Sequence, residues 1–88
     1  MLRIGICDDN GRDIDRIKGL ALRFSAEHPE TPVQIQAYES PYDLLDDMEK
    51  TGGFDLYLLD VVMPSMTGVD LARRIRERKE RAEILFLT

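Results

Sequence analysis

The sequence has few of the residues that mark several classes of protein. It holds one cysteine, Cys7, among 88 residues. A single cysteine excludes an internal disulfide and favours a reducing compartment, so we expect a cytoplasmic location. There is no tryptophan, no apolar run of the roughly 20 residues that a membrane span needs, and no signal-peptide pattern. We therefore expect a single domain over residues 1–88, with no membrane contact.

Positive charge is the scarcer sign in this sequence. Lysine and arginine number 12 against 17 aspartates and glutamates, which gives a net charge of −5. The run from Arg73 to Arg81 is basic, but glutamates interrupt it and cations suit the end of a helix. We therefore expect no direct contact between this segment and nucleic acid.

Apolar residues recur with two different periods along the chain. Helical spacing predicts helices over residues 11–27, from Pro41 to the Gly52-Gly53 pair, and onward from residues 67–70. Apolar or alternating runs predict strands over residues 2–7, 33–38, 54–60 and 83–88. Strands that alternate with crossover helices predict an α/β fold with a doubly wound parallel sheet.

The second and third predicted strands decide between two common strand orders. Residues 33–38 alternate apolar and polar, as expected of an edge strand, whereas residues 54–60 are apolar on both faces, as expected of a central strand. The order 2-1-3-4 satisfies both patterns, and the order 3-2-1-4 does not. In the first order, the first and third strands are neighbours, so their ends bring Asp8 and Asp9 close to Asp60.

Three carboxylates at one end of a sheet indicate a site for a divalent cation. Their mutual repulsion raises some of their pKa values, and a hard cation such as Mg²⁺ relieves it. A carboxylate beside such a metal can attack a phosphoryl group and form an aspartyl phosphate. Taken singly, each acid is more often a turn former or a helix cap. Taken together, Asp8, Asp9 and Asp60 favour a metal site.

Other phosphate chemistries lack their signature residues. No G-x-x-x-x-G-K-[ST] precedes the third predicted strand, and no G-x-G-x-x-G follows the first. A phosphatase with an Asp-x-Asp pair is disfavoured because Asp8 and Asp9 are adjacent. Two alternatives stay open: an interaction module whose acids only cap helices, and a small Mg²⁺-dependent phosphatase.

Three segments resemble those of bacterial response-regulator receiver domains. They are Cys7-Asp8-Asp9-Asn10, the D-x-x-M-P-x-x-x-G run from Asp60 to Gly68, and Thr88 at the end of the fourth predicted strand. The resemblance covers residues 1–88 and implies a flavodoxin-like, CheY-like fold. A further likeness at residues 54–60 and 38–40 is to regulators with a LytTR-type DNA-binding output.

The resemblance implies a role for each site residue. Asp60 is the expected phosphoacceptor, and Asp9, Asp60 and the backbone carbonyl of Val62 are expected to bind Mg²⁺. Asp8 is expected to hold a metal-bound water, and Thr88 to supply the switch hydroxyl. The implied partners are a sensor histidine kinase and an output domain that binds DNA. Such a domain is not an enzyme in the usual sense, because it promotes only its own phosphorylation and dephosphorylation.

The chain departs from the family pattern after its fourth strand. Receivers have a further helix, strand and helix, and the lysine that follows their fifth strand has no counterpart here. We therefore expect this 88-residue chain to bind Mg²⁺ but to be phosphorylated slowly. We also expect it to self-associate, because the apolar strand around Leu85 would be an exposed edge.

Overall fold

Strands and helices alternate along the chain in the computed structural model, which describes residues 1–78 and 81–87. The elements in order are β1 (Leu2–Cys7), α1 (Gly11–Glu27), β2 (Val33–Tyr38), α2 (Pro41–Thr51), β3 (Leu56–Asp60), α3 (Gly68–Arg78) and β4 (Glu83–Leu87). They form one four-stranded parallel sheet in the order β2-β1-β3-β4. The predicted fold class and strand order are confirmed.

The register of the central strands sets the position of the acids. Cys7, the last residue of β1, lies beside Tyr38 of β2 and beside Leu59 of β3. Asp8 follows β1 directly, and Asp60 is the last residue of β3. Parallel pairing therefore places both carboxylates at the same edge of the sheet.

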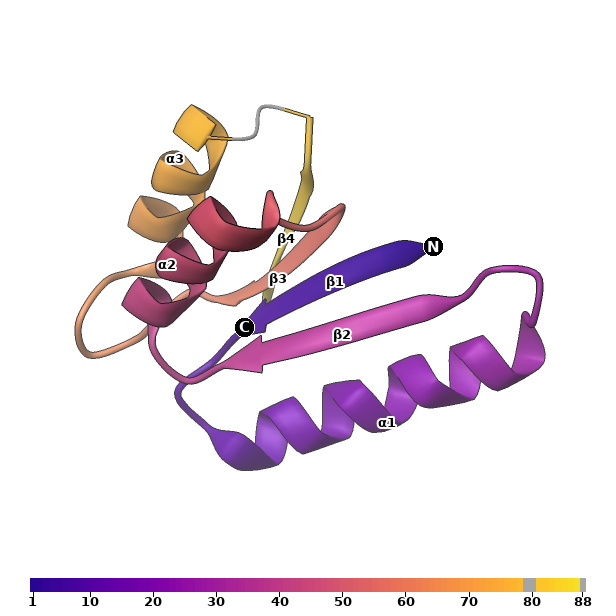
Figure 1. The fold of residues 1–88 in the computed structure, drawn as a ribbon. Coiled ribbons are helices and arrows are strands. Elements are labelled where there is room, and N and C mark those ends of the chain that lie inside the picture. The colour runs from indigo at the N-terminus through magenta and orange to yellow at the C-terminus, as the bar shows by residue number, and fades with distance from the viewer. Residues whose placement is uncertain (79–80, 88) are drawn as a thin grey trace.

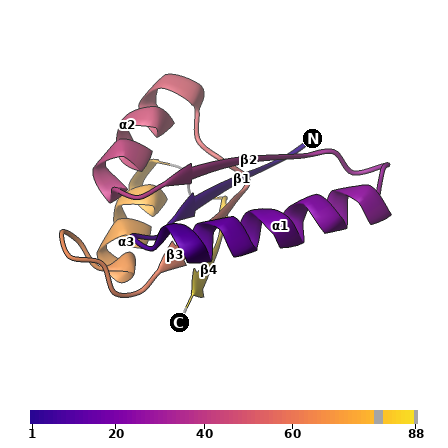
Figure 2. The ribbon, with the colours of Figure 1, turned by 90° about the horizontal axis from the view of Figure 1, so that it is seen from below.

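Helices cover the two faces of the sheet unequally. Helix α1 lies on one face, and α2 and α3 lie together on the other (Figure 1). The same two layers are visible from below (Figure 2). The larger core cluster lies on the side of α2 and α3 and includes Leu44, Leu59 and Leu71, all fully buried. The smaller one, on the α1 side, consists of Ile4, Ile6 and Ile14, with half-buried neighbours.

The helices begin and end at the residues that the sequence marks. Asn10 caps α1, because its side-chain oxygen accepts a hydrogen bond from the Arg12 N–H at 2.9 Å. Gly52 ends α2 in the left-handed conformation, with φ of 84°, and its N–H donates to the Met48 carbonyl. Ser40 occupies the N-cap position of α2, but its side chain makes no capping hydrogen bond.

Strand β3 begins at Leu56, two residues later than predicted. The Phe54 N–H donates to the Tyr57 hydroxyl at 3.0 Å, not to a neighbouring strand. The Asp55 carboxylate accepts the Arg3 N–H at 2.9 Å. The backbone of Asp55 still pairs with both neighbouring strands, because its N–H donates to the Arg3 carbonyl at 2.8 Å and its carbonyl accepts from the Glu83 N–H at 3.0 Å. Backbone pairing therefore stops at Phe54, whose N–H the Tyr57 hydroxyl takes.

The two edges of the sheet differ in hydrophobicity. Strand β2 is one edge and alternates between half-buried and exposed residues over most of its length, as predicted. Strand β4 is the other edge and exposes 56% of Leu85 and 46% of Phe86. Thr88, predicted to end this strand, lies outside the described residues. Among the described residues, no helix combines the length and hydrophobicity needed to cross a membrane.

Candidate functional site

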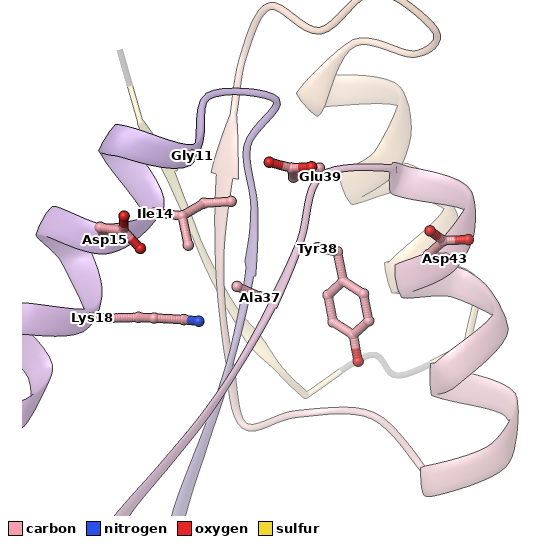
Figure 3. Close-up of a pocket in the computed structure, with 8 residues that line it drawn as sticks. All are labelled: Gly11, Ile14, Asp15, Lys18, Ala37, Tyr38, Glu39 and Asp43. Carbon is pink, nitrogen blue, oxygen red and sulfur yellow. The ribbon is translucent and has the colours of Figure 1, made fainter.

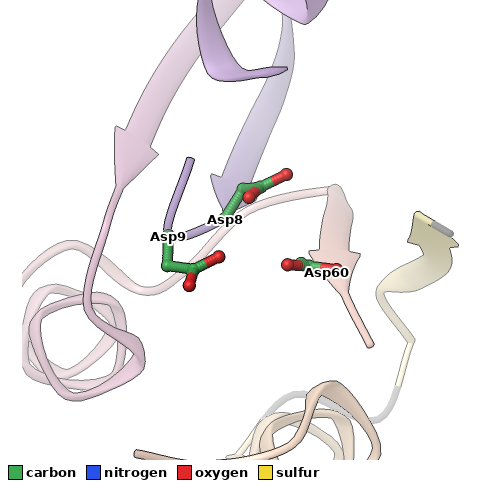
Figure 4. A group of neighbouring side chains, drawn as sticks. All are labelled: Asp8, Asp9 and Asp60. Atoms are coloured by element: carbon green, nitrogen blue, oxygen red, sulfur yellow. The ribbon is translucent and has the colours of Figure 1, made fainter. Parts of the chain in front are cut away.

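Three aspartates converge at the carboxyl edge of the sheet. Asp8 and Asp9 follow β1, and Asp60 ends β3 beside them (Figure 4). Carboxylate oxygens of the three residues, one from each, lie within 4.8 Å of one another. The acids that the sequence predicted to meet, from two strands far apart in the chain, are therefore together.

Asp8 is the buried member of this cluster, with 3% of its surface exposed. Burial, followed by the charges of Asp60, Asp13 and Asp9, raises the pKa of Asp8 above its ordinary value. The Asn10 N–H opposes this effect, because it donates to Asp8 Oδ1 at 2.9 Å and favours the ionised form. The cluster thus holds more negative charge than its surroundings neutralise.

Asn10 also bears on the interpretation of the two acids before it. Because the Asn10 side chain caps α1, neither Asp8 nor Asp9 is needed as the helix cap. The sequence placed Asn10 only in a polar turn. Its position one residue before the helix start was the signal for a cap. Its N–H donates to the side chain of Asp8 two residues earlier, which is the bond expected of a turn-forming aspartate.

The loop after β3 closes under the site. The Val62 N–H donates to Asp60 Oδ1 at 3.4 Å, and the Gly68 N–H donates to the Val61 carbonyl at 2.9 Å. Met63 is buried, and its sulfur lies 3.6 Å from the sulfur of Cys7 at the end of β1. The loop is therefore anchored on the same two strands that carry the acids.

Cys7, which contacts Met63 beneath the acids, forms the floor of the site together with the loop after β3, and it is fully buried. Burial, with the nearby charges of Asp8 and Asp60, raises the pKa of its thiol to about 12. The thiol therefore stays protonated and is a packing group, as its place in an apolar run predicted.

Two of the hollows beside α1 lie near the carboxyl edge of the sheet. One, of about 360 Å³, is lined by Asp8 and Asp60, by residues of α1 that include Arg16, and by the end of β4. The other is larger, about 570 Å³, and lies between α1 and the start of α2 (Figure 3). Its lining residues are Gly11, Ile14, Asp15, Lys18, Ala37, Tyr38, Glu39 and Asp43. Asp8 and Asp60 of the cluster line the smaller hollow, so the size of a hollow does not identify the site.

The donor set of the cluster fits Mg²⁺. Each member offers carboxylate oxygens, which are the ligands that this cation prefers. The raised pKa of Asp8 is the electrostatic cost that a bound cation would remove. The Val62 carbonyl as a ligand, and Thr88 as the switch hydroxyl, stay predictions.

Comparison with known families adds a decisive observation. A family model described as the response regulator receiver domain matches residues 6–88. The chain belongs to this family. It is therefore the receiver domain of a two-component response regulator, and the family resemblance in its motifs is confirmed.

The receiver domain is similar to proteins of known sequence and structure. The transcriptional regulatory protein NatR of Bacillus subtilis is 26% identical over all 88 residues, which are 35% of that protein. A receiver domain from Clostridium thermocellum has the same fold, with a TM-score of 0.82 at 21% identity, and the chain covers 65% of it.

A third relative was solved with bound ligands. The response regulator TrrA of Thermotoga maritima, in complex with Mg²⁺ and BeF, is 32% identical, with a TM-score of 0.70. All of the receiver domain aligns with 70% of the TrrA chain. TrrA was also solved in complex with the histidine kinase ThkA, and there the TM-score is 0.68. The receiver domain thus spans about a third of NatR and about two thirds of each of these solved chains.

Proposed function

We propose that this receiver domain accepts a phosphoryl group on Asp60 from a histidine kinase. The observation that carries the proposal is the convergence of Asp8 and Asp9 on Asp60, within 4.8 Å, at the edge of the sheet. Asp60 is partly exposed there, so a donor can reach it. The phosphoacceptor is then the one acid of the three that ends a central strand.

The transfer exchanges one bond of phosphorus for another. A carboxylate oxygen of Asp60 forms a bond to phosphorus while the bond from phosphorus to the histidine nitrogen breaks. The electron pair of the broken bond stays on the imidazole nitrogen, which can take up a proton from solvent. The product is an acyl phosphate on Asp60, which water later hydrolyses.

The acidic cluster is proposed to hold Mg²⁺ for this transfer. Asp9, Asp60 and the Val62 carbonyl are the proposed direct ligands, and Asp8 holds a bound water. When bound, Mg²⁺ supplies positive charge that offsets the carboxylates and the phosphoryl oxygens. Asp8 Oδ1 is held by the Asn10 N–H, which fixes the carboxylate in place before any ligand arrives. The complex of TrrA with Mg²⁺ and BeF supports Mg²⁺ as the cation.

The proposed partners are a sensor histidine kinase and an output domain. The complex of ThkA with TrrA supports the kinase, because TrrA is 32% identical to this chain. The similarity to NatR supports an output in transcription, and DNA binding of the LytTR type is the form proposed for it. The domain acts on its own aspartate and not on an external substrate. A free, buried cysteine suits the cytoplasm, where such an exchange takes place.

Labelling with a small phosphodonor tests the proposal. The chain is incubated with acetyl phosphate and Mg²⁺, and the modified residue is mapped by mass spectrometry after borohydride reduction of the acyl phosphate. We expect slow labelling of Asp60 that requires Mg²⁺ and is absent in Asp60→Asn. Asp55→Asn is the matched control, because Asp55 lies at the other end of β3 and should not change the labelling. Labelling of another aspartate, or none at all, would contradict the proposal.

A further inference from the structure

Arg16 of α1 has a place in the site that the family motifs do not assign. It lines the hollow of about 360 Å³ that also contains Asp8 and Asp60. Asp13, one turn earlier on α1, lines the same hollow. Among the lining residues that the structure describes, Arg16 carries the one positive charge.

The charge around this hollow creates a difficulty for any phosphodonor. Asp8, Asp13 and Asp60 all line it with carboxylates. A phosphoryl group is itself an anion, so the carboxylate charge of the lining that Mg²⁺ does not offset repels it as it approaches. A cation at the mouth of the hollow would offset this repulsion.

The side chain of Arg16 is free to exchange partners. Its guanidinium pairs with Asp13 at 3.0 Å, and 74% of the side chain is exposed. An exposed pair one turn apart on a helix is weak. A guanidinium prefers the two oxygens and the greater charge of a phosphoryl group, which it binds with two parallel hydrogen bonds.

We propose that Arg16 leaves Asp13 and binds the phosphoryl group of the incoming donor at the mouth of the site. This inference rests on the proposed function, because it assigns a positioning residue to the transfer onto Asp60. Arg16 binds phosphoryl oxygens and makes no bond to the reacting aspartate. The competing interpretation is a solvated ion pair on an exposed helix face, in which Arg16 has no part in the reaction.

Steady labelling rates at a series of acetyl phosphate concentrations separate these interpretations. For Arg16→Gln we expect the donor concentration at half-maximal rate to rise roughly five-fold, the value of one exposed charge-assisted contact. The maximal rate and the Mg²⁺-induced shift in melting temperature should stay close to those of the wild type. Arg16→Lys should restore part of the affinity, and added salt should shrink the difference between wild type and Arg16→Gln.

Arg23→Gln is the matched control. Arg23 lies on the same face of α1, two turns further and about 10 Å along the axis, and its loss changes the net charge equally. Suppose that Arg16→Gln and Arg23→Gln raise the acetyl phosphate concentration at half-maximal rate equally, while Asp60 of the wild type is labelled. The role of Arg16 is then overturned and the proposed function stands. If the wild type is not labelled on Asp60, both are overturned.

Discussion

Gly68 approaches the backbone of Asp60 so closely that no side chain fits between them. A β-carbon at position 68 would lie 2.9 Å from the carbonyl carbon of Asp60 and closer still to its oxygen. It would also lie 3.0 Å from the α-carbon of Val61. The start of α3 is therefore packed against the main chain of the proposed phosphoacceptor.

This contact predicts a large effect of Gly68→Ala. The clash is with backbone atoms, which cannot rotate away, so β3 or α3 must shift. We expect a loss of about 2 kcal/mol in the free energy of unfolding, typical of overpacking a tight contact. Urea denaturation measures it.

The matched control for that substitution is Gly19→Ala. Gly19 lies in α1, and a β-carbon there would meet nothing within 4 Å. We expect this variant to be more stable than the wild type by about 0.5–1 kcal/mol, because alanine favours a helix. Equal stability changes in the two variants would show that the contact with Asp60 does not matter.

Mg²⁺ is expected to stabilise the folded chain through the acidic cluster. A ligand that binds only the folded state adds about 2.7 kcal/mol at one hundred times its dissociation constant. Thermal melts with and without Mg²⁺ should therefore differ for the wild type and differ much less for Asp9→Asn. An undiminished Mg²⁺ effect in Asp9→Asn would favour the interaction module whose acids bind no metal.

Asp8→Asn should behave differently, because Asp8 is buried. Asparagine keeps an oxygen for the Asn10 N–H but removes a buried charge. We expect this variant to be more stable than the wild type without Mg²⁺ and to gain less from Mg²⁺. A variant that is less stable in both conditions would mean that the Asp8 charge is structural.

The environment of Tyr38 predicts that the stability of the fold falls at alkaline pH. Its hydroxyl donates to Asp47 at 2.6 Å, and burial and this carboxylate raise its pKa well above the ordinary tyrosine value of 10.0. The folded state therefore binds the proton more tightly than the unfolded state does. This contribution to stability is complete below pH 10 and is lost as the pH rises from 10 towards the folded-state pKa.

Urea melts of the wild type and Tyr38→Phe measure this effect. At about pH 8 the variant should be less stable by about 1 kcal/mol, since it lacks the hydrogen bond to Asp47. Above pH 10 the wild type should lose stability faster than the variant, so the difference narrows. Parallel pH curves would rule out a role for the Tyr38 proton.

The apolar edge of β4 predicts association of this 88-residue chain. Leu85 is 56% exposed on a strand that pairs on one side only with β3, among the described residues. Leu85→Lys should lower the average mass in light scattering at high concentration, because a charge on an edge strand opposes pairing. Leu22→Lys is the control, because Leu22 is an exposed apolar residue of α1, away from the β4 edge. This variant should leave the average mass unchanged. A wild type that is monomeric throughout would contradict the prediction.

The sequence determined the strand order because two strands carried opposite patterns. The alternation of β2 marked an edge, and the apolar run before Asp60 marked the centre of the sheet. Side chains alternate between the two faces of a strand, so the spacing of apolar residues indicates whether one face or both faces are buried. Once the order was known, the meeting of Asp8 and Asp9 with Asp60 followed from parallel pairing.

Other features of the site were beyond the sequence because they depend on side-chain conformation. The burial of Asp8 and the place of Arg16 in the hollow both require coordinates. The start of β3 was misjudged because Phe54 is apolar enough to continue a strand, whereas the Tyr57 hydroxyl takes its N–H. A pattern of hydrophobicity contains no information about such a competing acceptor.

The sulfur contact between Cys7 and Met63 joins residues 56 positions apart in the chain. The floor of the site therefore has no local precursor, and an unfolded chain has to close a long loop before the three acids meet. For this reason the unfolded ensemble should bind Mg²⁺ only as loosely as scattered carboxylates do. Mg²⁺ should then chiefly lower the unfolding rate and lengthen the lifetime of the native state, with little effect on the folding rate.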